Sequence, residues 1–271
     1  MKNIYTYLYI VLISMSPSSS SLASTQTDLE HLKQAYPETI CSVDQNHIYW
    51  ANGDSMIVDA QPSNRLPEEI LNTPLLLDQI RKIHYQPGIP TDPEHYTPKD
   101  DPGRIRYEPF FRKMYGETES EVETHLTTIF WMPNVFGTVY PLKVTKINGI
   151  DQKFIQISND LEQLVQSHPD YIPYLEHPSE TFNWRVIANT NRISPHSFGM
   201  TIDLKEDISD YWQWDLSKAN LPISEFRSKP LIYRNQIPWE IIPVFEAQGF
   251  IWGGKWAHYD TQHFEYRPEL F

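Results

Sequence analysis

The sequence predicts an α+β fold in which helices pack against a small antiparallel sheet. Three short segments, residues 184–188, 200–204 and 263–266, have the β-branched or alternating character of strands. Two longer segments, residues 154–166 and 237–250, have the spacing of helices. Because strands and helices follow one another without regular alternation, an α+β arrangement is favoured over a doubly wound parallel sheet.

The first half of the chain carries fewer structural signals. Apolar runs flank Asn52-Gly53-Asp54, and Asn-Gly suits a tight hairpin turn whose two central residues adopt positive φ. Residues 86–103 are rich in proline and acidic residues and show no periodicity, which predicts a loop or linker. Residues 135–149 are expected to form a pair of strands.

Two helices are predicted in the second half. The segment 154–166 is typical of an amphipathic helix that lies on a core, because five apolar residues share one face: Phe154, Ile157, Leu161, Leu164 and Val165. In the segment 237–250, Pro238 suits a helix start and Gly249 suits a C-terminal cap. Pro243 implies a kink or a later start.

The first residues predict a secretory signal. A lysine precedes an apolar run from about Ile4 to Met15, and a serine tract and small residues follow as far as Ala23, where cleavage is expected. The run is shorter than the roughly 20 residues that a membrane-spanning helix needs. We therefore expect residues 1–23 to be removed and the mature protein to be periplasmic or extracellular, without stable membrane insertion.

Composition excludes some functions. The formal net charge of −13 argues against nucleic acid as the main partner, because a phosphate backbone is bound largely through Lys and Arg. No G-x-x-x-x-G-K-[ST] or G-x-G-x-x-G motif supports a nucleotide site. Cys41 is the single cysteine, so no internal disulfide can form, and we expect a small buried side chain there.

The strongest chemical signal is a pair of short motifs. The first is S-P-H-S-F-G-M-T-I-D at residues 194–203, and the second is D-T-Q-H-F-E at residues 260–265. A catalytic zinc needs three protein ligands and one open position, and two imidazoles with one carboxylate supply that set. His196, Asp203 and His263 are therefore the expected metal ligands.

The local structure expected around these motifs brings the ligands together. Gly199 allows the chain to reverse before the strand that carries Asp203. Alternation places Asp203 and Ile202 on opposite faces of one strand, and His263 and Phe264 on opposite faces of another. Both strands can then direct their polar side chains at one point.

Hydrolysis at such a site also requires a general base that is not consumed as a ligand. Asp260 precedes His263 by three residues, and we favour it for that role. Glu265 is the rival because it shares a strand face with His263, although it could equally orient an imidazole by accepting its second N–H.

The pattern S-x-H-x-x-G-x-x-x-D followed late by D-x-x-H resembles the M15 metallopeptidases, the family of D-alanyl-D-alanine carboxypeptidases and L-alanyl-D-glutamate endopeptidases. The flanking residues 182–204 and 237–270 are similar to one branch of that family. The resemblance spans roughly residues 133–271 and implies a hedgehog-like fold with a single zinc site on a small antiparallel sheet. It divides the chain into a signal peptide (1–23), an N-terminal region of unknown role (24–132) and an M15-like peptidase domain (133–271).

The resemblance also implies site roles. It implies zinc ligation by the two histidines and the aspartate named above, with Asp260 as the base that acts on zinc-activated water, although the better-known dipeptidase relatives carry Glu there. A family arginine upstream of the first histidine stabilises the substrate carbonyl, and Arg192 is favoured over Arg185 as its counterpart. Further candidates for substrate contacts are Ser194, Trp256 and Glu265.

The expected function is zinc-dependent hydrolysis of peptidoglycan stem peptides or muropeptides, as a carboxypeptidase for D-Ala-D-Ala or an endopeptidase for L-Ala-D-Glu. One alternative is a non-catalytic zinc-binding or wall-binding module, against which an acidic residue at position 260 argues. Another is a cysteine peptidase that uses Cys41 and a histidine, whose activity chelators would not affect.

Overall fold

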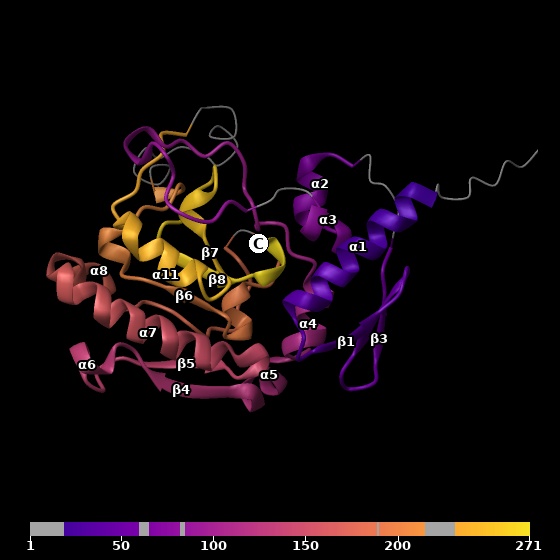
Figure 1. Ribbon diagram of the computed structural model, residues 1–271, viewed down its shortest axis with the longest axis horizontal. Coiled ribbons are helices and arrows are strands. Elements are labelled where there is room, and N and C mark those ends of the chain that lie inside the picture. The colour runs from indigo at the N-terminus through magenta and orange to yellow at the C-terminus, as the bar shows by residue number, and fades with distance from the viewer. Residues whose placement is uncertain (1–18, 60–64, 82–84, 189, 215–230) are drawn as a thin grey trace, which may run out of the picture.

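The computed structural model describes residues 19–59, 65–81, 85–188, 190–214 and 231–271. Within these residues the chain forms α-helices, short 3-10 helices and small antiparallel sheets, in agreement with the α+β prediction. Figure 1 shows the amino-terminal elements on one side of the molecule, the middle and C-terminal elements on the other, and the C-terminus of the chain between them.

The amino-terminal elements comprise a three-stranded antiparallel sheet of order β1-β2-β3 and several helices. The strands are β1 (Ile40–Val43), β2 (His47–Trp50) and β3 (Ser55–Ile57), and the helices are α1 (Ser19–Ala35), α2 (Pro67–Asn72), α3 (Leu76–Arg81), α4 (Glu108–Tyr115) and α5 (Glu119–His125). The predicted hairpin is confirmed, because β2 and β3 pair with Ile48 opposite Met56. The turn differs from the prediction: Gly53 has φ of +90°, Asn52 does not have a positive φ, and the Gly53 N–H donates to the Trp50 carbonyl at 3.0 Å.

Cys41 is exposed, so the expectation of a buried cysteine is wrong. Strand β1 has an irregularity between Ile40 and Ser42, and this irregularity breaks the alternation of its faces. Ile40 is buried, whereas Cys41 and Ser42 are both exposed.

The middle of the chain forms a second sheet of two strands, β4 (Leu126–Phe130) and β5 (Pro141–Thr145). The prediction of a strand pair within residues 135–149 is therefore wrong, since the partner of β5 lies upstream of that segment. Residues at the start of the segment belong to the short helix α6 (Pro133–Phe136), which begins with a proline and ends at Gly137 with φ of +63°. The predicted boundary between residues 132 and 133 falls in the connection between these paired strands.

Helix α7 (Ile150–Ser167) confirms the predicted amphipathic helix. Four of the five predicted core-facing residues are buried, and Leu164 is partly buried against the core. Figure 1 shows α7 running between the β4–β5 pair and the C-terminal sheet. The helix packs against β4 and β5, and the centroid of its Phe154 ring lies 4.9 Å from that of the Phe250 ring in the C-terminal sheet. The short helix α8 (Ile172–Leu175) follows it.

The C-terminal sheet has the antiparallel order β6-β8-β7, formed by β6 (Thr201–Asp203), β8 (His263–Tyr266) and β7 (Phe250–Trp252). The predicted strands at 200–204 and 263–266 are confirmed. Ile202 lies opposite Phe264, and Asp203 lies opposite His263. Ile202 and Phe264 are fully buried in the core, so Asp203 and His263 share the other face, as the alternation predicted.

Residues 184–188 do not form the predicted strand, and they make only an isolated bridge between Val186 and Ile193. The side chain of Ser197 explains the difference, because its Oγ accepts from the Arg185 N–H and donates to the Arg185 carbonyl, both at 3.0 Å. The Arg185 N–H is thus bonded to a side chain and not to a neighbouring strand, whereas the Arg185 carbonyl also accepts from the Ser194 N–H at 2.9 Å.

The segment 237–250 begins with a 3-10 turn, Trp239–Ile241, which leads into the short helix α11 (Ile242–Glu246). The later start implied by Pro243 is confirmed, since this proline occupies the first turn of α11, where no backbone N–H is needed. The expectation that Gly249 caps this helix is wrong, because α11 ends at Glu246 with Ala247 as its C-cap. Gly249 has φ of +82° in the turn that leads to the next strand.

The amino-terminal and C-terminal elements share one hydrophobic core. The core includes Tyr36, Phe110 and Phe154 as well as Phe264, and the Tyr36 and Tyr266 rings are in edge contact with centroids 6.1 Å apart. Residues 86–103 form an irregular loop with one 3-10 turn at Pro93–His95, in agreement with the loop prediction. This loop is bound to the C-terminal part, for example through Lys255, which donates to the carbonyls of Gln86 and Gly88 at 2.8 Å.

The expected signal region lies largely outside the described residues. Residues 1–18 are not described, and the expected cleavage point near Ala23 falls within α1. In the part of the chain that the structure describes, no helix combines the length and the apolar character needed to cross a membrane. Export and cleavage therefore stay predictions.

We predict that the isolated fragment of residues 133–271 will not fold cooperatively. It lacks β4, which pairs with β5, and it lacks the leucines of α1 and the aromatic residues of α4 that complete the shared core. Thermal unfolding followed by near-ultraviolet circular dichroism should show a sharp transition for residues 24–271 and none for the fragment. A sharp transition for the fragment would establish residue 133 as a true domain boundary.

Candidate metal centre

The candidate site lies on the polar face of the C-terminal sheet. His196 belongs to the 3-10 helix η4 (Pro195–Phe198), Asp203 ends β6, and His263 begins β8. Gly199 connects η4 to β6 with φ of +64°, and a Cβ there would lie 2.7 Å from the Leu126 side chain. This position therefore requires glycine for both its conformation and its space.

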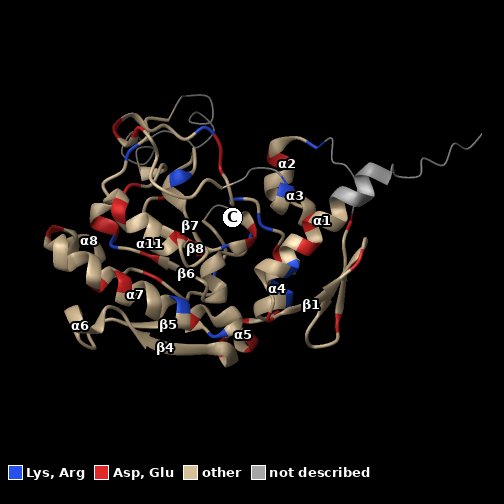
Figure 2. Cartoon of the chain, viewed as in Figure 1, with Lys and Arg blue, Asp and Glu red and all other residues tan. Residues whose placement is uncertain are grey.

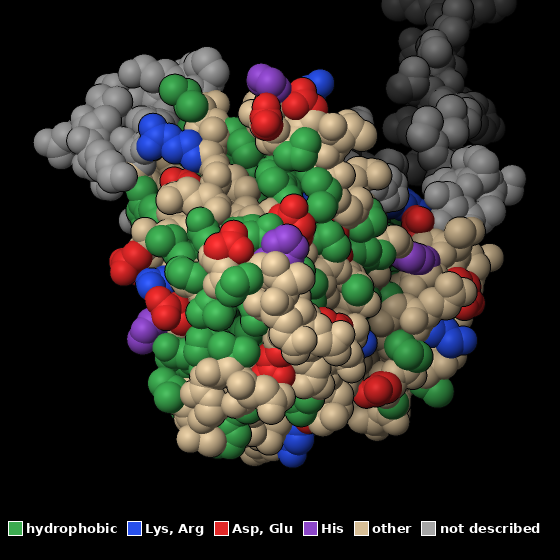
Figure 3. Space-filling model, turned by 60° about the vertical axis from the view of Figure 1, so that its left-hand side comes forward, with side chains coloured by type: hydrophobic (Ala, Val, Ile, Leu, Met, Phe, Trp, Pro, Cys, Tyr) green, Lys and Arg blue, Asp and Glu red, His purple; other side chains and the backbone are tan. Residues whose placement is uncertain are grey.

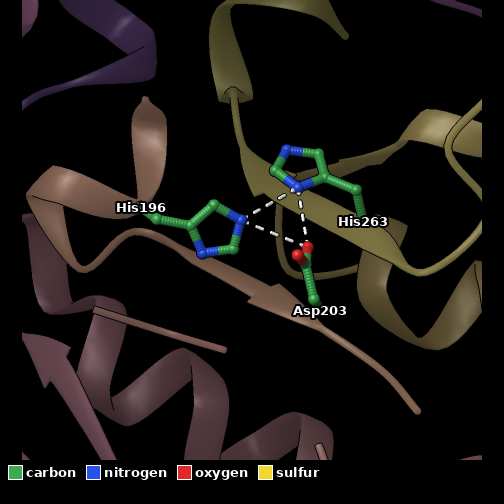
Figure 4. Close-up of side chains that lie close together, drawn as sticks. All are labelled: His196, Asp203 and His263. Carbon is green, nitrogen blue, oxygen red and sulfur yellow. Dashed lines mark hydrogen bonds and ion pairs between the residues drawn. The ribbon is translucent and has the colours of Figure 1, made fainter. Parts of the chain in front are cut away.

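The three predicted ligands converge on one point, as Figure 4 shows. The Nδ1 atom of His263 lies 2.9 Å from Asp203 Oδ1 and 3.3 Å from His196 Nε2. The His196 Nε2 atom lies 3.2 Å from the same carboxylate oxygen. Ligand atoms at about 2.0–2.1 Å from a tetrahedral zinc are about 3.3 Å apart, so the donor set and its spacing fit that ion.

The electrostatics of the site also suit a cation. All three side chains are buried. Burial opposes ionisation of Asp203, yet the charges and hydrogen bonds of His196 and His263 hold the pKa of that carboxyl below its usual range. Burial likewise disfavours protonated His263, but its hydrogen bonds to Asp203 and Glu265 raise its pKa to about 9. The surrounding groups thus favour positive charge at the centre, which a divalent metal would supply.

Glu265 lies behind His263 and orients its ring. One carboxylate oxygen of Glu265 is 3.3 Å from His263 Nε2, on the side of the ring away from the other ligands. A hydrogen bond from Nε2–H leaves the Nδ1 lone pair directed at the centre. Arg106 donates through Nε to both oxygens of Glu265, at 2.7 and 3.0 Å, and Arg267 donates through Nη1 at 3.3 Å. These arginines hold the pKa of Glu265 low despite its complete burial.

Asp260, the predicted general base, is half-buried and lines the same cavity as the three candidate ligands. Its Oδ1 atom is buried and accepts no hydrogen bond from the residues that the structure describes. Burial and the charge of Asp203 raise the pKa of the Asp260 carboxyl to about 6. The backbone carbonyl of Asp260 accepts from the His263 N–H at 3.2 Å, so the D-x-x-H turn fixes the two side chains relative to each other. An unpaired carboxylate oxygen in such a position is suited to exchange protons.

A cavity of about 450 Å³ opens onto these residues. Its walls include the three ligands and Asp260, and also Arg104, Arg106, Glu180, Arg185, Tyr211 and Trp256. Glu180 Oε2 lies 3.4 Å from His196 Nδ1, so this imidazole also faces a carboxylate on its far side. On the face of the molecule in Figure 3, apolar side chains form broad patches interrupted by acidic groups.

The structure separates the predicted substrate contacts. Ser194 and Trp256 line the cavity, and the Ser194 Oγ accepts from the His196 N–H at 3.3 Å, so it caps η4. Arg185 also lines it and is paired with Glu180 at 2.8 Å. Glu265 is wholly buried and is not in the cavity wall.

Arg192, the favoured arginine, lines an adjoining pocket instead of this cavity. The role expected for it, at the reacting carbonyl, therefore stays a prediction that its position does not favour.

Sequence reasoning missed Arg104 and Arg106. Both come from the segment after the proline-rich loop, and both guanidinium groups lie over the Trp256 ring, 5.2 and 5.7 Å from its centroid. The alternating Arg-Ile-Arg pattern was the available signal, since it places two cations on one face of an extended segment. Nothing local to that segment indicated which part of the fold it would contact.

One comparison with known proteins finds a family match that includes this site. Residues 188–266 match the family described as D-alanyl-D-alanine carboxypeptidase. The match contains all three candidate ligands and Asp260. No curated protein and no solved structure matches the chain.

We predict that Glu265→Gln will weaken zinc binding by about 10- to 100-fold, the usual effect of losing a partner of a metal-bound histidine. The amide cannot accept the Nε2–H bond with the strength of a carboxylate. Competition with a chromogenic chelator measures the affinity. Glu269→Gln is the matched control, because Glu269 is also buried and bonded to Arg267 but does not contact His263. Equal losses in both variants would mean that the effect arises from general destabilisation.

Proposed function

We propose that this chain, as a member of the M15 family of peptidases, is a zinc-dependent hydrolase of peptidoglycan stem peptides. The observation that carries the proposal is the convergence of two imidazoles and one carboxylate beside a second, unpaired carboxylate in one cavity. The family match supports a peptidase that acts on a peptidoglycan-related substrate. Carboxypeptidase and endopeptidase action both remain within the proposal.

His196, Asp203 and His263 would hold the zinc ion. A bound zinc supplies Lewis acidity, which polarises a substrate carbonyl and makes water more acidic at neutral pH. Glu265 accepts from the far nitrogen of His263 and so keeps the orientation of that ring. Glu180 faces the far nitrogen of His196 at 3.4 Å, without a hydrogen bond. The scaffold is rigid at these positions because two ligands are paired across adjacent strands.

Asp260 moves the proton in this scheme. Its unpaired oxygen accepts a proton as water attacks the carbonyl carbon, and the same proton passes to the nitrogen as the C–N bond breaks. The products are a carboxylate and an amine. Arg104 lines the same cavity and is close enough to lower the pKa of Asp260, so its charge can stabilise negative charge that develops on the carbonyl oxygen.

The place of action is also a proposal. We propose that the chain is exported, because its first residues have the pattern of a cleaved signal, and that it meets its substrate in the periplasm or outside the cell. In Figure 2 the acidic and basic residues are spread along the chain in small groups, and no described element is a continuous run of basic residues. This distribution supports a neutral or zwitterionic peptide substrate better than nucleic acid.

We predict that Asp260→Ala will keep stoichiometric zinc and lose hydrolysis by about 100- to 10,000-fold, the contribution expected of a general base. Zinc content measured by atomic emission and turnover of purified muropeptides test the two parts separately. Undiminished turnover would remove Asp260 from the mechanism. A wild-type protein that binds zinc but yields no product from any muropeptide would favour the non-catalytic binding module.

We also predict that a chelator will abolish muropeptide cleavage and that added zinc will restore it. Mass spectrometry of the products, with and without chelator, tests metal dependence and identifies the bond together. Loss of one terminal alanine indicates a carboxypeptidase, whereas cleavage between L-Ala and D-Glu indicates an endopeptidase. Cys41→Ser should retain full activity, because this exposed residue lies on β1 and does not line the cavity. Activity that survives chelation but not Cys41→Ser would indicate a cysteine peptidase.

A further inference from the structure

We propose that Arg192 binds a carboxylate of the substrate, in a pocket that adjoins the metal centre and is built in part by the amino-terminal region. This inference rests on the proposed peptidase function and assigns it a specificity-determining residue. Arg192 would then discriminate a peptide with a free carboxylate close to the bond to be cleaved from the same peptide with that carboxylate blocked.

The pocket is a cavity of about 230 Å³ beside the metal centre. Its walls are mostly apolar and include Phe111, Phe198 and Met200. Arg106, Ile187 and Pro195 line both this pocket and the metal cavity, and Pro195 directly precedes the ligand His196. A peptide bound over the metal centre can therefore extend a short group into the second pocket.

Arg192 is the cation of this pocket that has no partner. Among the described residues, none forms a hydrogen bond or ion pair with its guanidinium group, and its Nε atom is buried without a partner. The other arginines around the two cavities are engaged: Arg106 is bonded to Glu265, Arg185 to Glu180, and Arg104 to the His258 carbonyl at 2.7 Å. A partly buried cation without a counter-charge is unfavourable, and a bound carboxylate would supply the missing charge.

The surroundings of Arg192 strengthen its attraction for an anion. Burial and the neighbouring charges of Arg106 and Arg104 lower the pKa of Arg192 to about 10, so it stays protonated at neutral pH. Glu108 lines the same pocket, but it is already bonded to Arg112 at 2.7 Å, and its other oxygen lies 3.4 Å from the Ile193 N–H. An incoming carboxylate therefore meets an unmatched positive charge.

The chemistry of the guanidinium group favours a carboxylate as the occupant. Its planar set of N–H donors matches the two oxygens of a carboxylate, and such pairs are stronger when water is partly excluded. The apolar walls can contact the small side chain or methylene groups next to it. Two sources share this chemistry: the C-terminal carboxylate of a stem peptide, and the α-carboxylate of an internal glutamate that is linked through its side chain.

Matched pairs of peptides test the inference. One pair has a C-terminal carboxylate or a C-terminal amide, and the other has an internal side-chain-linked glutamate with a free α-carboxylate or its α-amide. We expect the zinc-loaded wild-type protein to cleave the acid of at least one pair with a higher kcat/KM than the matching amide. That pair identifies the source of the carboxylate. Arg192→Gln should lower kcat/KM for this acid by about 10- to 150-fold, as for a lost hydrogen bond to a charged group, and change the amide by less than about 2-fold.

The same design separates carboxylate binding from a role at the reacting carbonyl. Arg192→Gln would lower kcat equally for acid and amide if the guanidinium acted on the carbonyl, and that result would overturn the inference. Lys143→Gln is the control for net charge, because Lys143 is an exposed residue of β5 outside both cavities, and it should leave the acid preference unchanged.

If the wild-type protein hydrolyses none of the peptides, the proposed function is rejected. Binding measurements can still test whether Arg192 recognises a carboxylate. Calorimetry should then show that the wild type binds one acid about 10- to 150-fold more tightly than its amide, and that Arg192→Gln does not discriminate. A wild-type protein that binds acids and amides equally would overturn the inference independently of catalysis.

Discussion

The buried carboxylate of Glu265 is the contact on which the arrangement of this protein depends. It faces Nε2 of the candidate ligand His263, accepts from Arg106 of the amino-terminal region, and accepts from Arg267 near the C-terminus. Arg267 in turn bonds to Glu269, which accepts from Tyr36 at the end of the first helix. Removing one member of a buried ion network leaves the others without their counter-charges. The network therefore couples the geometry of the metal centre to the docking of the amino-terminal region.

This coupling gives the amino-terminal region a physical role in the site. Arg104 and Arg106 reach the metal cavity from a segment that follows an irregular loop, and the loop is itself bound to the C-terminal part through Lys255 and Trp256. The wall of this cavity also holds carboxylates, those of Glu180, Asp203, Glu206 and Asp260. Arg192 lies in the adjoining pocket, and no described residue pairs with its guanidinium group, so an anionic group would find its counter-charge there.

Sequence reasoning succeeded where the signal was local. The positions of Asp203 and His263 followed from strand alternation, and their partners Ile202 and Phe264 are buried as that alternation required. It failed where the partner of a segment lay outside that segment. The Arg185 N–H donates to the Ser197 hydroxyl where a strand at 184–188 was expected, and β5 pairs with a strand upstream of the segment in which its partner was expected.

The sequence by itself predicted the α+β class and two short motifs that carry the candidate ligands and a nearby acid, because each motif depends on residues close together in the chain and on the period of a strand or helix. Only the tertiary structure decided which arginines surround the cavity and which of them lacks a partner among the described residues. Charge pairing between Arg106 and Glu265 spans 159 positions of the chain. No local pattern encodes such a contact, since it forms only when the shared core brings the two segments together.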